Sequence, residues 1–367
     1  MTIHTDILIL GGGISGLLTA RELCLAGLKV VILDKSQLGR ESSWAGGGIL
    51  LPIYPWRQDA AISALVVNSL NKYPQLNRAL LAATGIDPEW RDCGMLICKN
   101  PDVSEAVQWC QQYGIVCQTA PFELLEGLHT LFAQPLWLPE IAQIRNPRLL
   151  KSLLANLRQS GVEFIENTEI GRLMVNRRRL ERLDTSNGSF SFGHLIVCTG
   201  AWTTGFLETL LPSIPESLNL SIQPIKGQML VFNAKPETLG HMVLDGDQYL
   251  IPRRDGRILA GSTVETSGFD KSVTDEARQK LYEFATGLLP DIAQFPVEHH
   301  WAGLRPGTPL GVPYIGLHPD YENLGVNAGH FRNGLVMGPA SAKLIADLIL
   351  HRTTSIDPGP YALNREN

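Results

Sequence analysis

The first 34 residues carry a pattern that few folds can accommodate. Residues 6–10 (DILIL) are typical of a short buried strand, and a Gly-x-Gly-x-x-Gly motif follows at once from Gly11. Apolar residues then recur at helical spacing over 14–26, and the β-branched run 29–33 (KVVIL) is typical of a second buried strand. Strand, helix and strand in this order predict a βαβ unit in a parallel sheet with helices on its faces.

The glycine spacing indicates a dinucleotide site. Gly11 permits a tight turn, Gly13 lets the backbone approach a pyrophosphate, and Gly16 lets the helix pack against the sheet. The helix N-terminus adds free N–H groups and a positive dipole. Asp34, at the end of the second strand, is placed to bond a ribose hydroxyl, which argues against NADP. This pattern does not separate FAD from NAD, and a tight turn without a ligand is the alternative.

A second glycine-rich segment follows Asp34. Three consecutive glycines at 46–48 make a poor helix or strand, because each loses much conformational entropy on ordering. Their use is close approach of the backbone to a flat or bulky ligand, and Ser42 and Ser43 could donate to a pyrophosphate. A flexible surface loop is the alternative, but the apolar residues 49–51 favour burial.

The rest of the chain predicts two kinds of sheet. The middle, residues 222–301, alternates apolar and polar residues with frequent turns, as expected for a mostly antiparallel sheet. Because the two patterns are interleaved, we expect the chain to cross between two domains more than once. Helices are expected at 57–83, 146–160, 272–289 and 333–350, and further strands at 93–98, 162–165, 170–175, 182–185, 194–198, 227–232, 248–252 and 257–263.

Two arginines stand in apolar, glycine-rich segments, Arg305 in WAGLRPG and Arg332 in AGHFRNG. An unpaired buried charge costs about 3–5 kcal/mol, and a guanidinium suits a carboxylate through two parallel hydrogen bonds. Neither segment contains an acid, so the partner is either a substrate carboxylate or a distant Asp or Glu. Tyr249 belongs to a predicted strand, where its hydroxyl could join the same site or its ring could serve packing alone.

Composition narrows the class of protein. A chain of 367 residues favours two domains, and its formal net charge of −5 gives no sign of a nucleic-acid partner. We expect no signal peptide or membrane span, and the six cysteines form no Cys-x-x-Cys, which favours free thiols in the cytoplasm. His299 and His300 point to opposite faces of a strand, so no metal site is expected.

At the glycine-rich segments and around the two arginines, the chain resembles the glycine oxidase branch of the D-amino acid oxidase family of FAD-dependent oxidoreductases. The resemblance extends over nearly the whole length of the chain. The segments that carry the resemblance are GGGISG (11–16), SSWAGGG (42–48), NPRLLKSL (146–153), IVCTGAW (196–202), PIKGQM (224–229), IPRRDGR (251–257), WAGLRPGT (301–308), PYIG (313–316) and GHFRNG (329–334).

The resemblance implies an α/β fold with a Rossmann-like FAD-binding domain of the glutathione reductase type and an α+β substrate domain on an antiparallel sheet. The FAD-binding domain is expected at 1–85, 145–215 and 305–367, and the substrate domain at 86–144 and 216–304. Residues 308–316 contain no cysteine of the kind that tethers flavin in sarcosine oxidase relatives, so the FAD is expected to be non-covalent. Trp44 and the three glycines differ from an alanine-rich loop in some relatives, which leaves the substrate range open.

The resemblance also implies the residues of the site. Arg305 matches the family's principal ligand of the substrate carboxylate, and Arg332 and Tyr249 match its supporting ligands. The residues expected to bind FAD are Gly11, Gly13, Ile14, Ser15, Gly16, Asp34, Lys35, Ser42, Ser43, Gly46, Gly47, Gly48, Ile170, Gly200, His330, Phe331, Arg332, Asn333, Gly334 and Leu335.

The activity that the resemblance implies is oxidative deamination of glycine and other small amines, such as sarcosine and small D-amino acids. A hydride would pass to flavin N5, giving glyoxylate or another 2-oxo acid, ammonia and hydrogen peroxide, or an imine for thiamine thiazole synthesis. The expected partners are the amine and oxygen, without nucleic acid, and a homo-oligomer is possible. The alternatives are a D-amino acid dehydrogenase that reduces a quinone, a tRNA-modifying flavin domain, which the net negative charge disfavours, and a flavoprotein without catalysis.

Overall fold

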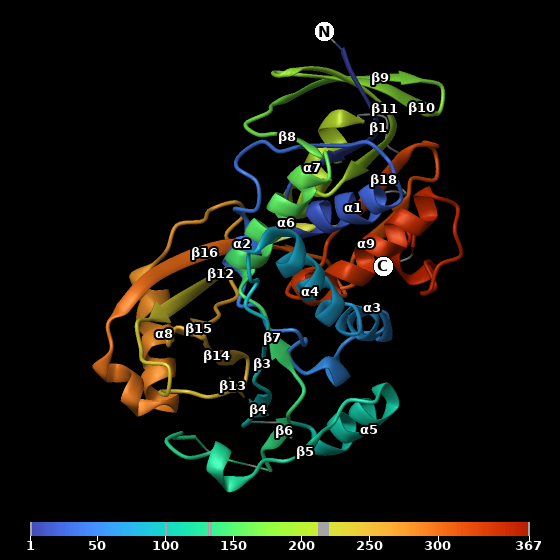
Figure 1. The fold of residues 1–367 in the computed structure, drawn as a ribbon. Coiled ribbons are helices and arrows are strands. Elements are labelled where there is room, and N and C mark those ends of the chain that lie inside the picture. Colours follow the sequence, from blue (N-terminus) through green and yellow to red (C-terminus); the bar gives the residue numbers. More distant parts are fainter. Residues whose placement is uncertain (1, 100, 131, 133, 212–219, 366–367) are drawn as a thin grey trace.

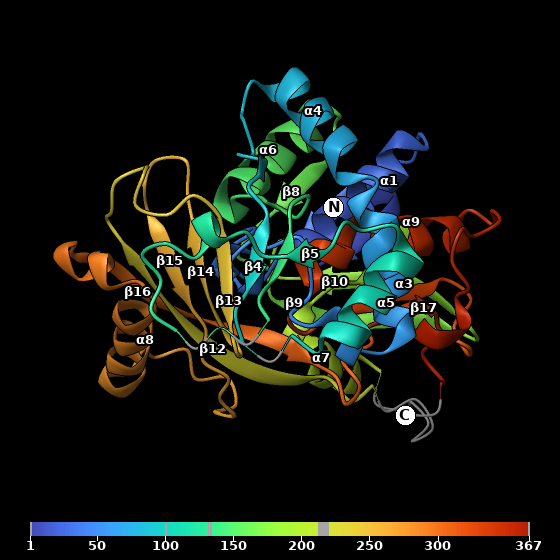
Figure 2. The same cartoon turned by 90° about the horizontal axis from the view of Figure 1, so that it is seen from below.

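The computed structural model describes residues 2–99, 101–130, 132, 134–211 and 220–365. Two eight-stranded sheets form the framework, and Figures 1 and 2 show them as separate layers with helices packed on each. The order of strands is β17-β18-β11-β1-β2-β8 in the first sheet, with β10 and β9 added beside β11, and β16-β12-β15-β14-β13-β4-β6-β5 in the second.

The first sheet is parallel at its centre, where β1 pairs with β2 and β11. β18 and β8 continue this parallel arrangement, whereas β17 and the β9–β10 hairpin are antiparallel. Its strands are β1 (Thr2–Leu10), β2 (Val30–Leu33), β8 (Glu163–Ile165), β9 (Ile170–Asn176), β10 (Arg179–Thr185), β11 (Gly188–Val197), β17 (Tyr314–Leu317) and β18 (Leu324–Ala328).

Alternate residues of β1 enter two different cores, as a strand buried on both faces requires. Ile7 and Ile9 face a helical layer, while Leu8 and Leu10 pack with the β9–β10 hairpin and α7 (Thr203–Leu210). The helical layer consists of α1 (Ile14–Leu25), α3 (Ala60–Leu70), α4 (Tyr73–Thr84), α6 (Asn146–Gln159) and α9 (Gly334–Ile349). These helices fix the position of the α1 N-terminus above the end of β1.

The second sheet is antiparallel except between β13 and β4. Helix α8 (Asp275–Leu288) packs on its outer face and α5 (Val103–Tyr113) near its far end (Figure 1). Its strands are β4 (Met95–Ile97), β5 (Gln118–Thr119), β6 (Leu136–Leu138), β12 (Gln223–Phe232), β13 (Met242–Asp245), β14 (Gln248–Pro252), β15 (Ile258–Gly261) and β16 (Val297–Gly307); β3 (Arg91–Asp92) and β7 (Ala142–Gln143) form a small separate pair.

Two long strands link the layers. β12 and β16 lie side by side and pair over most of their length (Figure 2). Both strands contact the 3-10 turn η3 (Gly200–Trp202), which follows β11 of the first sheet. In this pairing Ile225 lies opposite Arg305, and Gly227 opposite Gly303. Arg305 is therefore held by a rigid ribbon at the junction of the two sheets.

Several expectations need correction. The single helix expected over 57–83 is two helices, α3 and α4, because Pro74 lacks a backbone N–H and fits only the first turn of a new helix. Helix α5 was not expected, and of β16 only a strand at His299 and His300 was, because the glycines of WAGLRPG are unfavourable in a strand. The expected domain boundary at 215/216 lies outside the described residues, and that at 304/305 falls within β16. The domain limits stay a prediction.

Candidate active site

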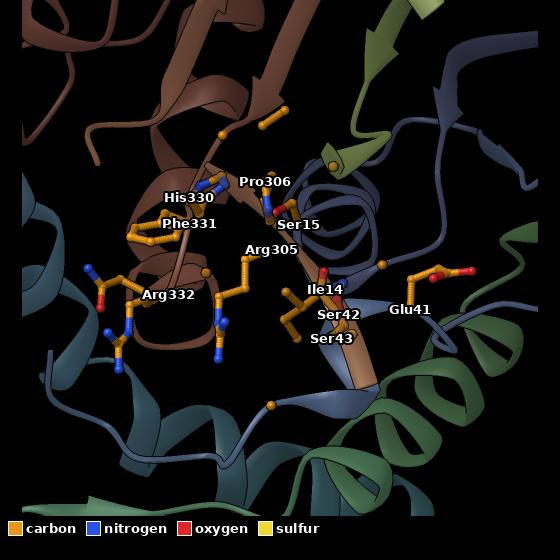
Figure 3. A pocket seen from close by; sticks show the side chains of 18 of the residues that line it. Ile14, Ser15, Glu41, Ser42, Ser43, Arg305, Pro306, His330, Phe331 and Arg332 are labelled. Atoms are coloured by element: carbon orange, nitrogen blue, oxygen red, sulfur yellow. Dashed lines mark hydrogen bonds between the residues drawn. The ribbon is translucent and has the colours of Figure 1, made fainter. Parts of the chain in front are cut away.

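A cavity of about 1400 Å³ lies between the two sheets, which is large even for a ligand pocket. The turn after β1, the glycines at 46–48, the inner face of the second sheet and the loop 328–335 all contribute to its wall. Every residue that the sequence nominates lines this cavity except Gly16. Figure 3 shows Arg305 and Arg332 on one side, and Ile14, Ser15, Ser42 and Ser43 beside the N-terminus of α1.

One end of the cavity is built from the glycine turn. Gly11 has a φ of +101°, and a β-carbon there would lie 2.5 Å from the carbonyl oxygen of Cys198. Gly16 does not line the cavity but packs beneath the turn. A β-carbon there would lie 2.0 Å from the carbonyl oxygen of Gly11, so the close packing requires glycine. Ser43 Oγ accepts from the Ile14 N–H at 2.9 Å, whereas no described residue accepts from the N–H groups of Gly13 and Ser15. Free donors at a helix N-terminus suit a pyrophosphate.

Asp34 is locked in place at the same end. Its Oδ2 accepts from the Gly12 N–H at 2.7 Å and its Oδ1 from the Ser36 N–H at 2.9 Å. Burial raises the pKa of Asp34, and these hydrogen bonds oppose that rise. The carboxylate is thus oriented by the backbone and keeps acceptor capacity for a hydroxyl group.

Aromatic rings border this end, which Ile170 and Gly200 also line. The Lys35 ammonium lies 3.5 Å from the ring centre of Trp202, and Trp202 stacks on Phe269 at 5.5 Å between centres. Phe269 lies just before α8, the helix that packs on the second sheet. A segment of the second layer therefore reaches the nucleotide end of the cavity.

The centre of the cavity is formed by the glycines at 46–48. A β-carbon at Gly47 would lie 2.6 Å from Cδ1 of Ile251, and one at Gly48 would lie 1.9 Å from the carbonyl oxygen of Ile144. Asn146 lines the cavity here: its amide nitrogen donates to the Ser43 carbonyl at 2.8 Å, while its buried Oδ1 has no donor among the described residues. Phosphate donors at one end and an unsatisfied acceptor beside a glycine cradle at the centre fit a flavin dinucleotide.

The far end holds an arginine whose charge has only neutral acceptors. Arg305 Nη2 donates to Ser262 Oγ at 2.8 Å, and Nη1 donates to the carbonyl oxygens of Thr263 at 3.0 Å and Lys226 at 3.3 Å. Within the described part of the chain, no carboxylate lies within ion-pair distance of it. Burial lowers the pKa of Arg305 to about 10, so the group stays charged at neutral pH.

Tyr249 and Arg332 complete this end. The Tyr249 hydroxyl donates to Ser262 Oγ at 3.2 Å, so one serine hydroxyl is shared with Arg305. Arg332 approaches the Asp247 carbonyl with Nη2 at 3.5 Å, and Figure 3 shows its side chain extending in the same direction as that of Arg305. Two guanidinium groups and a phenol therefore face one space, an arrangement that suits a carboxylate.

The loop 330–335 is fixed by hydrogen bonds to residues outside the loop. His330 is buried, its Nε2 lies 3.1 Å from Ser341 Oγ, and burial lowers its pKa to about 4, so the ring is neutral at pH 7. The Phe331 N–H donates to the Pro306 carbonyl at 2.8 Å, and Asn333 Nδ2 donates to Gln58 Oε1 at 2.9 Å. Gly334 and Leu335 also line the cavity. This loop is a fixed wall between the clamp and the first sheet.

Sequence reasoning missed several residues of the site, namely Asn146, Trp202, Gly227, Ser262 and Phe269. Three of them lay inside segments that resemble the family, NPRLLKSL, IVCTGAW and PIKGQM, but nothing in the local pattern distinguished them. The described residues contain no group of three or more His, Cys, Asp or Glu side chains arranged to hold a metal ion. None of the described helices combines the length and the apolar character that crossing a bilayer requires.

The fold and this cavity define a flavin-dependent oxidoreductase. The family model for FAD-dependent oxidoreductases of the DAO type matches residues 6–348, and the chain belongs to this family and binds FAD. The resemblance inferred from the sequence is confirmed, as is the fold class.

Glycine oxidases are among the proteins to which the chain is similar. The glycine oxidase of Pseudomonas aeruginosa is 43% identical over 97% of this chain and 98% of that protein. The bifunctional protein ThiO/ThiG of Trichormus variabilis is 32% identical over 95% of this chain, which spans 53% of that longer protein. The crystal structure of glycine oxidase from Geobacillus kaustophilus, 28% identical, has a TM-score of 0.91 with full coverage of both chains.

Proposed function

We propose that this chain is a glycine oxidase that converts glycine and other small amines, such as sarcosine and small D-amino acids, to a 2-oxo acid, ammonia and hydrogen peroxide. The observation that carries the proposal is Arg305, a half-buried cation that faces the cavity and contacts only neutral acceptors. A charge with so little access to water is stabilised by an anionic partner, and a substrate carboxylate supplies one.

In this proposal Arg305 is the main ligand of the carboxylate, and Arg332 and Tyr249 support it. Clamping the carboxylate leaves the substrate little freedom except rotation about its own bonds, so the α-carbon is presented in one orientation. The bound FAD supplies the hydride acceptor, and therefore the chain need provide no nucleophile. Two adjacent guanidinium groups also disfavour the ammonium form of the substrate, which must lose a proton before hydride can leave.

The cofactor contacts are proposals with different kinds of support. The free N–H groups of Gly13 and Ser15 support pyrophosphate binding, and the locked carboxylate of Asp34 supports a ribose contact. The unsatisfied Oδ1 of Asn146 supports placing the flavin beside the glycines at 46–48. We propose a non-covalent FAD, because 308–316 contains no cysteine.

We also propose a cellular compartment, a pathway, an electron acceptor and an assembly for this enzyme. The six cysteines are all free, which favours a reducing cytoplasm. The likeness to a bifunctional ThiO/ThiG protein supports a role in thiamine synthesis, where the imine would be consumed. Oxygen is the proposed acceptor, nucleic acid is not a proposed partner, and assembly into a homo-oligomer is part of the proposal.

The test compares wild type with Arg305→Met on two kinds of amine. Loss of two charge-assisted hydrogen bonds, at about 1.5–3 kcal/mol each, predicts a fall in kcat/KM for glycine of roughly 10²–10⁴-fold with FAD retained. Ethylamine, which has no carboxylate, serves as the matched substrate and should lose little. An Arg305→Met protein with near wild-type kcat/KM for glycine would refute the clamp.

The same samples separate the alternatives. Anaerobic mixing with a panel of amines should bleach the flavin absorbance, fastest for the preferred amine. In air, glycine should then give one peroxide per amine oxidised. Bleaching without peroxide in air would instead indicate a dehydrogenase that needs another acceptor.

A further inference from the structure

A second guanidinium, that of Arg253, is buried behind the cavity wall. Its residue is only 4% exposed and directly follows β14, the strand that carries Tyr249. Nη1 donates to Gln143 Oε1 at 2.6 Å and to the Ile144 carbonyl at 3.3 Å, and Nη2 donates to the Gly47 carbonyl at 2.7 Å. Among the described residues no carboxylate accepts from it. Unlike Arg305, it is enclosed and does not line the cavity.

The peptide bond between Gly47 and Gly48 has its carbonyl oxygen on Arg253 and its N–H on the other side. In a trans peptide the N–H of the next residue points away from the carbonyl, so the Gly48 N–H extends on the side opposite to Arg253. Both glycines line the cavity, and no acceptor for either N–H occurs in the part of the chain that the structure describes. An N–H donor is thus held at the cavity wall, and no described residue accepts from it.

The position of this peptide connects it to the chemistry of the site. A β-carbon at Gly47 would lie 3.3 Å from the ring of Tyr249, so the peptide lies between the clamp and the nucleotide end. A cation that accepts density from the carbonyl polarises the whole peptide and strengthens its N–H as a donor. A positive charge and a strong donor near a flavin ring favour the reduced form, which carries more negative charge.

We propose that Arg253 is a positioning residue that directs the Gly48 N–H at the flavin ring and, by its charge, raises the flavin midpoint potential. The proposal rests on the proposed place of the flavin beside the glycines at 46–48. It assigns a function to the first arginine of IPRRDGR, which contacts neither the substrate clamp nor the cavity directly.

The test measures the two-electron midpoint potential of holoenzymes by equilibration with a reference dye, without any amine. Arg253→Met should shift the equilibrium at least tenfold toward oxidised flavin, which is a fall of about 30 mV. Arg253→Lys, which keeps the charge, should stay within threefold of wild type. The neighbouring Arg254→Met is the matched control, because Arg254 is exposed and pairs with Asp87, and it should leave the potential unchanged.

The outcomes separate this proposal from a purely structural role. Weaker FAD binding by Arg253→Met with an unchanged potential would overturn the proposal, and so would an Arg253→Lys potential as low as that of the Met variant. If Arg253→Met does not yield folded protein, Arg253→Gln removes the charge while keeping a polar contact and carries the same expectation. Because no amine is used, failure of glycine oxidation would refute the proposed function and leave this comparison intact.

Discussion

Gly227 offers a sharp test of how the clamp is built. It stands on β12 beside the guanidinium of Arg305, and a β-carbon there would lie 2.2 Å from both Nη1 and Nη2. Ordinary contact needs about 3.4 Å, so Gly227→Ala must move the guanidinium by about 1 Å or more. That movement would break the hydrogen bonds that Arg305 makes to Ser262, Thr263 and Lys226.

The expected cost follows from this displacement. Misplacing a reacting group by about 1 Å can lower the rate by about 10²-fold, so kcat/KM for glycine should fall by roughly that factor. FAD content should remain at one per chain, because the nucleotide end of the cavity lies elsewhere. Steady-state peroxide formation over a range of glycine concentrations, with flavin absorbance on the same samples, measures both quantities.

A matched control is available on α8. A β-carbon at Gly287 would meet nothing within 4 Å, so Gly287→Ala should leave kcat/KM unchanged and add about 0.5–1 kcal/mol of stability as a helical alanine. If Gly227→Ala keeps kcat/KM within threefold of wild type, the guanidinium either has room to move or does not bind the substrate. Either result would refute the geometry of the clamp.

Two further predictions concern the cofactor and pH. Phe269→Ala removes the stacking on Trp202, worth about 0.5–1.5 kcal/mol, and should raise the FAD dissociation constant about 2- to 10-fold in a fluorescence titration, whereas Phe122→Ala, at an exposed ring, should not. His330 has its pKa lowered from 6.5 to about 4, so the unfolded state binds more protons between these values and stability falls as pH drops through this window. At pH 5 the loss is about 2 kcal/mol, and His330→Gln should remove that part of the pH dependence in urea unfolding while His299→Gln should not.

The nucleotide end was the part of the site most open to prediction from sequence. Strand, glycine turn, helix and acid follow one another within the first 34 residues, and local rules govern each step. Gly11, Gly13 and Asp34 line the nucleotide end of the cavity, and a β-carbon at Gly16 would meet the turn at 2.0 Å, but the contacts of these residues with FAD stay a prediction. What local rules could not supply was the contact from Phe269, which is more than 200 residues away and reaches Trp202 only through the placement of the second sheet.

The clamp depended on strand register, which a single sequence specifies poorly. Gly227 lies opposite Gly303 and two positions from Ile225, the partner of Arg305, so the space for the guanidinium exists only in that register. A shift by one residue would bring a side chain to the same place. The need for small residues on both strands was visible only as glycines in PIKGQM and WAGLRPGT, without a reason for either.

Arg253 and Arg305 show where the argument from sequence reaches its limit. Burial lowers the pKa of each guanidinium to about 10, and each donates only to neutral oxygens. They differ in what they face: Arg305 lines the cavity, whereas the donors of Arg253 are used behind its wall. The sequence around Arg305 indicates a charge that needs a partner and the sequence around Arg253 does not, so only the fold decides whether each partner is a ligand or a peptide carbonyl.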